Sequence, residues 1–237
     1  MKNIISIVIL MLAGCKANHE VKKVESSVAP VVEETNKQKF AMEGPSTQGN
    51  IVHADRKYYQ VWYDLSKKCP VAVDWTISPK DGERKVRRAG QHFYTDTDIT
   101  SADNSDYNRI GFDRGHMVPC EDMSFSKEAQ TETFRMSNVC PQYPALNRGP
   151  WEHLEKALRD SAKSNTVTIS AGPIWNSADT TVINGMTVPG AYWKVWDING
   201  HKEGVICANT PNKDVNTCNP VSLDSIAKVS EGYSLIK

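Results

Sequence analysis

One segment of this chain, between residues 113 and 159, carries an imidazole, an amide, two carboxylates and two guanidinium groups around a predicted helix start. It begins with the tetrapeptide Asp113-Arg114-Gly115-His116 and continues to Asn147, Glu155 and Arg159. Glu155 and Arg159 lie four residues apart, so they are neighbours on one flank of a helix. Taken alone, such a pair is more often an ordinary surface ion pair, and only the whole set indicates a site.

The predicted helix covers residues 150–163. Pro150 suits a first helical position, and Gly149 is a tolerable N-cap before it. An apolar stripe at i, i+3 and i+7 would pack this helix on a sheet; it consists of Trp151, Leu154 and Leu158. Asn147 then lies in the lead-in, close to the positive end of the helix.

These residue types meet the needs of phosphodiester hydrolysis, which requires a base, a divalent cation and cationic groups for the phosphate oxygens. His116 can be the base because an ordinary imidazole pKa of about 6.5 leaves it mostly neutral near pH 7. Asn147 offers a carbonyl oxygen to Mg²⁺. Asp113 could orient the imidazole or a metal-bound water, and Glu155 could hold another such water.

Arginines complete the predicted site. Arg114 and Arg159 suit phosphate because the guanidinium fork can bind two oxygens at once. A separate basic run, residues 80–88, has Lys or Arg at five of nine positions. Such a run is more often a solvated strand or loop, and it does not by itself indicate a polyanionic partner.

The segments 106–123 and 133–155 resemble the DNA/RNA non-specific endonucleases with a ββα-metal (His-Me finger) site, whose signature is DRGH. The resemblance extends from about Tyr58 to the C-terminus. DRGH alone is modestly specific, but the added Asn147, Glu155 and Arg159 at this spacing make a strong pattern. It implies an α+β fold and a metal-dependent endonuclease that cuts both DNA and RNA.

Carried over residue by residue, the resemblance implies that His116 is the general base and Asn147 the only direct protein ligand of the metal. Glu155 would act through a coordinated water, and Asp113 matches the aspartate of the motif. Mg²⁺ is the expected cofactor, with Mn²⁺ or another divalent ion as alternatives.

The resemblance also implies that Arg114 and Arg159 contact phosphate and that a further arginine comes from an earlier strand. Three residues compete for that last role, namely Arg84, Arg87 and Arg88. We favour Arg88, which stands five residues before Phe93.

The composition allows one full domain, with 237 residues of which 39% are hydrophobic. The 28 basic and 28 acidic residues give a formal net charge of zero. This balance argues mildly against a protein that binds the phosphate backbone. Any favourable charge must therefore be local.

The N-terminal segment is expected to target the chain. The apolar stretch 4–13 is shorter than the roughly 20 residues needed to span a bilayer. The tetrapeptide Leu12-Ala13-Gly14-Cys15 resembles a bacterial lipobox, which implies cleavage before Cys15 and a lipid on its sulfur; the alternative is an ordinary secretory signal. We expect a signal peptide (1–14), a lipidated flexible tether (15–50) and an endonuclease domain (51–237) of an exported, membrane-anchored protein.

Strand and helix patterns alternate along the rest of the chain. Aromatic and β-branched residues alternate with polar ones on both sides of residues 66–70, which predicts a β-hairpin. The other predicted strands are 166–169, 191–197 and 204–208, and the predicted helices are 126–138 and 150–163. This mixture predicts an α+β fold with a central, mainly antiparallel sheet flanked by helices.

Cysteine pairing stays open in the sequence. Cys207 with Cys218 and Cys120 with Cys140 are plausible disulfides by proximity, but spacing cannot prove them. Five cysteines after Cys15 leave at least one unpaired. A zinc site or a nucleophilic Cys120 is a minor alternative, because no CxxC or HxxxH pattern is present.

Two classes of function therefore remain. The first is an active endonuclease, and the second is a catalytically weak, surface-anchored lipoprotein that binds nucleic acid or serves in adhesion. The combination of His116, Asn147 and Glu155 favours the enzyme, because a pure binder does not need a base beside a metal ligand. A preference for DNA or RNA is not predicted, since the phosphate backbone carries little base information.

Overall fold

The computed structural model describes residues 46–82, 86–175, 181–214 and 218–233. The expected signal peptide, most of the expected tether and Arg84 lie outside these residues. Among the described helices, none is long and apolar enough to cross a membrane.

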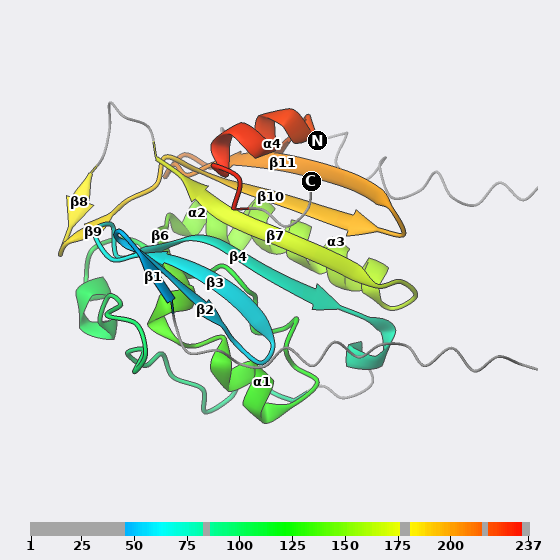
Figure 1. The fold of residues 1–237 in the computed structure, drawn as a ribbon, viewed down its shortest axis with the longest axis horizontal. Coiled ribbons are helices and arrows are strands. Elements are labelled where there is room, and N and C mark those ends of the chain that lie inside the picture. The colour runs from blue at the N-terminus through cyan, green and yellow to red at the C-terminus, as the bar shows by residue number, and fades with distance from the viewer. Residues whose placement is uncertain (1–45, 83–85, 176–180, 215–217, 234–237) are drawn as a thin grey trace, which may run out of the picture. The chain divides into compact units, whose positions relative to one another are not determined.

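The main feature of the fold is an eight-stranded sheet in which every neighbouring pair is antiparallel, so the predicted mainly antiparallel sheet is confirmed (Figure 1). In spatial order the strands are β1 (Ser46–Gln48), β2 (Ile51–Asp55), β3 (Tyr59–Asp64), β4 (Cys69–Ile77), β7 (Val167–Ile174), β10 (Ala191–Ile198), β11 (His201–Ala208) and β12 (Cys218–Val221). Two smaller sheets pair β5 (Asp113–His116) with β6 (Val139–Gln142) and β8 (Val182–Ile183) with β9 (Met186–Thr187).

The predicted hairpin is formed by β3 and β4, and its turn is stabilised by Asp64. The carboxylate Oδ1 of Asp64 accepts hydrogen bonds from the backbone N–H groups of Ser66 at 2.8 Å and Lys67 at 3.1 Å. Lys68 completes the turn with a φ of 50°. An aspartate that accepts from the backbone two residues on is typical of such turns.

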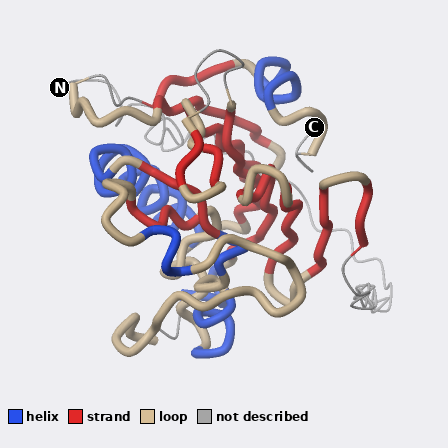
Figure 2. The backbone as a smooth tube through the Cα atoms, turned by 90° about the vertical axis from the view of Figure 1, so that its left-hand side faces the viewer, coloured by secondary structure: helices blue, strands red, loops and turns tan. Residues whose placement is uncertain are grey.

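Helices cover both faces of the sheet because the side chains of a strand alternate between them. On β10, Tyr192 and Trp196 lie in one core cluster with Leu158 of α3 (Glu152–Ala162), whereas Trp193 and Val195 lie in another. This second cluster contains Ile226 of α4 (Leu223–Val229). Figure 2 shows helices on either side of the strands.

The remaining helices are short. Two of them are α-helices, α1 (Lys127–Glu132) and α2 (Pro144–Leu146). Three are 3₁₀ turns, at Pro79–Gly82, Asn104–Tyr107 and Met136–Asn138, and one is a π turn at Asn147–Trp151. The helix predicted over 126–138 is therefore interrupted, and α3 begins at Glu152 rather than at Pro150. The backbone leaves the helical path at Gly149, with a φ of −132° and a ψ of −115°, directly before Pro150, and the π turn Asn147–Trp151 spans this break.

The candidate site lies in one long connection between two neighbouring strands. β4 and β7 pair directly, from Val73 with Ala171 to Ile77 with Val167, although residues 78–166 separate them in the sequence. This connection contains β5, β6, α1, α2 and α3. The sheet therefore holds both ends of the segment that carries the predicted site.

Of the two proposed disulfides, one is confirmed and the other is wrong. Cys207 and Cys218 face each other across β11 and β12 and form a disulfide. Cys120 and Cys140 are free and buried, as is Cys69. Cys140 lies on β6 opposite Gly115 of β5, and this strand pairing places it in the core instead.

We expect the Cys207→Ala/Cys218→Ala variant to lose about 2 to 3 kcal/mol of unfolding free energy, because the disulfide closes a loop with a sequence separation of 11. Urea unfolding with and without a reductant measures this loss. The reductant should destabilise the wild type by a similar amount and leave the double variant unchanged. A wild type that is insensitive to reductant would contradict the assignment.

Candidate active site

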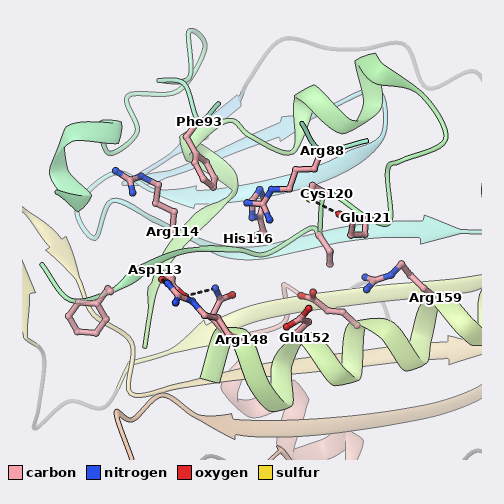
Figure 3. A pocket seen from close by; sticks show the side chains of 14 residues that line it. Arg88, Phe93, Asp113, Arg114, His116, Cys120, Glu121, Arg148, Glu152 and Arg159 are labelled. Atoms are coloured by element: carbon pink, nitrogen blue, oxygen red, sulfur yellow. Dashed lines mark hydrogen bonds and ion pairs between the residues drawn. The ribbon is translucent and has the colours of Figure 1, made fainter. Parts of the chain in front are cut away.

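The candidate site is a pocket of about 420 Å³ between the strand β5 and the helix α3. β5 and β6 form an antiparallel pair that is followed by α2, the turn 147–151 and α3. All seven residues predicted for the site line this pocket: Arg88, Asp113, Arg114, His116, Asn147, Glu155 and Arg159. Figure 3 shows His116 and Arg88 on one side and Glu152 and Arg159 of α3 on the other.

The imidazole of His116 is held by two aromatic rings. Its centroid lies 4.9 Å from that of Phe93 and 5.0 Å from that of Phe134, the latter edge to face. Burial, together with the positive charge of Arg88, lowers the pKa of His116 from its ordinary value to about 3. The imidazole is therefore neutral at physiological pH, so it has a free acceptor nitrogen, but a pKa this low makes it a weaker base than an ordinary histidine.

Asp113 does not contact His116 through any hydrogen bond among the described residues; it binds Asn147 and Arg148 instead. Its Oδ2 accepts from Asn147 Nδ2 at 2.9 Å and from Arg148 Nε at 2.8 Å, while its Oδ1 accepts from Arg148 Nη2 at 2.6 Å. This pairing fixes which end of the Asn147 amide is the nitrogen. Within the described residues, the Asn147 side-chain oxygen has no hydrogen-bond partner.

Glu155 and Arg159 do not form the surface ion pair that their spacing suggested. Glu155 Oε1 lies 3.5 Å from Lys194 Nζ on β10, and Arg159 Nη1 lies 2.9 Å from Asp122 Oδ1. Asp122 is buried, and its Oδ2 also accepts from the indole nitrogen of Trp75 at 2.8 Å. Burial raises the pKa of Glu155 to about 7, although Lys194 opposes this shift.

The guanidinium of Arg114 is engaged by the loop before β5. Its Nη2 donates to the carbonyl oxygen of Asn104 at 2.7 Å, and the group lies over the rings of Tyr107 and Phe93 at 5.4 and 5.9 Å. Arg114 lines the pocket, but part of its donor capacity is used within the protein.

Of the three arginines that competed for the earlier position, Arg88 lines the pocket. Its guanidinium lies 5.5 Å from the ring centroid of Phe134, the ring that also packs on His116. Arg87 is exposed and is not among the lining residues, and Arg84 lies outside the described residues.

Several residues of the site were not anticipated from the sequence. Arg148, Glu121 and Glu152 line the pocket. Lys194 was recognisable in principle, because alternation along 191–197 places it on the same face as the large apolar residues Tyr192 and Trp196. A charged residue on a core-facing position signals a buried partner.

The donor set suits a hard cation rather than zinc. The described residues contain no group of three or more His, Cys, Asp or Glu side chains arranged to hold a metal ion. The oxygen donors that line the pocket include the amide of Asn147, the carboxylates of Glu121 and Glu152, and the carboxylate of Glu155, whose Oε2 has no partner among the described residues. Few oxygen ligands with several retained waters are typical of Mg²⁺ sites.

Gly115 of the DRGH strand is required by close packing. A Cβ at this position would lie 2.3 to 2.5 Å from side-chain atoms of Gln142, which is fully buried on β6. Because Gln142 is enclosed, it cannot swing out into solvent to make room. The two strands therefore approach closely only with glycine here.

We expect Gly115→Ala to lower the free energy of unfolding by about 1 to 3 kcal/mol, through overpacking against Gln142. In a Gln142→Ala background the same substitution should cost less, because the colliding atoms are gone. Urea unfolding of the wild type, the two single variants and the double variant measures the coupling. Equal costs in both backgrounds would show that the contact does not set the requirement.

The relatives of this chain are nucleases. It is similar to Nuclease 1, mitochondrial, of Schizosaccharomyces pombe, with 34% identity over 142 residues, 57% of this chain and 43% of that protein. Endonuclease G, mitochondrial, of Homo sapiens is 41% identical over 128 residues, 51% of this chain and 42% of that protein. Nuclease EXOG, mitochondrial, of Xenopus laevis is 34% identical over 174 residues, which are 68% of this chain and 46% of that protein. The chain thus spans less than half the length of these relatives.

The fold is that of a solved nuclease structure. A chain in the crystal structure of the EndoG/EndoGI complex matches 76% of this chain and 83% of its own length, with a TM-score of 0.69 and 24% identity. The predicted α+β, ββα-metal fold is thereby confirmed. The family of DNA/RNA non-specific endonucleases matches residues 36–235. This chain therefore belongs to the DNA/RNA non-specific endonuclease family.

Proposed function

We propose that this protein is an endonuclease that hydrolyses phosphodiester bonds in both DNA and RNA with Mg²⁺ as its cofactor. The observation that carries the proposal is that one pocket is lined by a neutral imidazole, a free amide oxygen and a partly buried carboxylate, on His116, Asn147 and Glu155. Family membership supports the same activity.

In this proposal His116 is the general base. Its neutral ring takes a proton from a water molecule, whose oxygen forms a bond to phosphorus. The bond between phosphorus and the leaving oxygen breaks, and that oxygen takes a proton from solvent. The resemblance implies that the phosphate stays on the 5′ end.

Asn147 would hold the cation through its amide oxygen, and Glu155 would hold a water of its coordination sphere. When bound, Mg²⁺ supplies charge stabilisation for the crowded phosphate and the leaving oxygen. Asp113 is proposed to act on this site indirectly, since its hydrogen bond to the amide nitrogen of Asn147 keeps the amide oxygen available to the cation.

Arginine donors in the pocket support a nucleic-acid substrate, although the carboxylates of Asp113, Glu121, Glu152 and Glu155 balance their charge. Four arginines line the pocket, namely Arg88, Arg114, Arg148 and Arg159. Arg159 and Arg148 each hold an aspartate, but a guanidinium has five N–H donors, so donors remain for phosphate oxygens. Because such contacts read the backbone, they are consistent with cutting either nucleic acid.

We expect His116→Ala to abolish nearly all cleavage of plasmid DNA and of RNA in the presence of Mg²⁺, while substrate affinity stays close to that of the wild type. His153→Ala is the matched control, because His153 lies exposed on α3 and is not among the lining residues. Its activity should be unchanged, and a chelator should stop cleavage by both the wild type and this control.

Cleavage by His116→Ala at the wild-type rate would exclude the assigned base. Binding of nucleic acid without cleavage by the wild type, at any tested Mg²⁺ or Mn²⁺ concentration, would favour the alternative of a binding or adhesion lipoprotein.

We further propose that the protein is exported and anchored to a bacterial membrane through a lipid on Cys15, which rests on the tetrapeptide at residues 12–15. In a bacterial host fed radioactive palmitate, the wild type should be labelled and sediment with membranes, and Cys15→Ser should lose both properties. Cys69→Ser should keep the label. An unlabelled wild type would instead indicate an ordinary secretory signal.

A further inference from the structure

A lysine is completely buried beneath the candidate active site. Lys194 lies in the middle of β10, and its side chain has a relative exposure of 0%. Its cross-strand neighbours are Ala171 on β7 and Val205 on β11. These smaller side chains leave space above the sheet for the long lysine side chain, which lies on the face covered by α3.

The ammonium group of Lys194 is enclosed by two indole rings. Nζ lies 3.9 Å from the ring centroid of Trp151 and 5.5 Å from that of Trp75. Desolvated contacts of this kind contribute about 2 kcal/mol each. They cannot replace the hydration of an ammonium ion, whose removal from water costs several kcal/mol.

The charged partner of Lys194 is Glu155. Nζ lies 3.5 Å from Oε1, and the carboxylate is 12% exposed, on the pocket side. Oε1 is therefore contacted by Lys194 from the sheet side of the carboxylate, while Oε2 has no partner among the described residues. The pairing holds the carboxylate in one orientation and supplies its counter-charge from behind the pocket.

Resting on the proposed function, we propose that Lys194 is a positioning residue that keeps the Glu155 carboxylate oriented so that its second oxygen can serve the hydrated cation. Without Lys194 the carboxylate would be a partly buried, unpaired charge, which is strongly disfavoured. It would leave the pocket-facing orientation, and this change removes its second oxygen from the cation.

The test is a cycle of variants in which Mn²⁺ binding to the metal-free protein is measured by calorimetry, without nucleic acid. Lys194→Met keeps much of the side-chain volume and removes the charge. We expect it to weaken Mn²⁺ binding about tenfold or more, the usual effect of losing a partner of a metal-holding group. In a Glu155→Gln background, Lys194→Met should have no further effect.

Lys156→Met is the matched control, because it removes one positive charge from the exposed ion pair with Asp160 on α3. It should bind Mn²⁺ as the wild type does. Mn²⁺ binding by Lys194→Met that is as tight as in the wild type would overturn the proposal. Tighter binding would also overturn it, because Lys194 would then only repel the cation. A tenfold loss that persists in the Glu155→Gln background would also overturn it, since the effect would not pass through Glu155.

Folding gives a second measurement. If Lys194→Met is unfolded but Lys194→Met/Glu155→Gln is folded, the coupling between the two residues is shown directly and supports the proposal. If both are unfolded, Lys194 stabilises the sheet independently and the proposal fails. A wild type that binds no divalent cation would refute the proposed cofactor itself, which is distinguishable from every outcome above.

Discussion

The antiparallel pairing of β4 with β7 is the constraint on which the site depends. It brings together the two ends of the connection 78–166, although nearly ninety residues lie between them. Closing a loop of that length costs only slightly more entropy than closing a shorter one, because the cost grows with the logarithm of the length. The connection can therefore carry its own small sheet and helices while the main sheet fixes where it starts and stops.

The helix α3 is held on this sheet by apolar contacts and presents its polar flank to β5. Trp151 and Leu158 are almost fully buried, and the ring of Trp151 packs against that of Tyr192 at 5.6 Å between centroids. Complete burial of such side chains contributes roughly 1.5 to 3 kcal/mol each. A well-anchored helix places Glu155 reproducibly, which a site on a free loop could not do.

Much of this could be predicted, because it depends on local pattern. The hairpin of β3 and β4, the long strand β10 and the apolar stripe of α3 each follow from periodicity along one stretch of sequence. Six of the seven predicted pocket residues follow from the DRGH motif and its spacing to Asn147, Glu155 and Arg159, whereas Arg88 was one of three candidates that the resemblance left open. Strand order and the π turn Asn147–Trp151 before α3 were not predictable, since strand order depends on long-range pairing and the turn spans the two sides of Gly149.

The pairing of charges was also beyond the sequence, and the reason is geometric. Four residues apart on a helix, Glu155 and Arg159 are close enough to bind each other, but each has a better-placed partner in the core. Asp122 is buried and must be paired. Arg159 donates a hydrogen bond to one of its carboxylate oxygens, and Trp75 donates one to the other. Lys194 is equally buried and takes Glu155.

The two buried charges, on Asp122 and Lys194, determine the pairing, so the more exposed ion pair between Glu155 and Arg159 does not form. Surface ion pairs contribute at most about 1 kcal/mol, whereas leaving either Asp122 or Lys194 unpaired in the core would cost several kcal/mol. Arg159 of α3 therefore points toward Asp122 and Glu155 points toward Lys194, beneath the pocket. Because their partners differ, Glu155 and Arg159 are kept apart. That separation leaves the carboxylate oxygen Oε2 free for a ligand in the pocket, which a direct pair with Arg159 would have occupied.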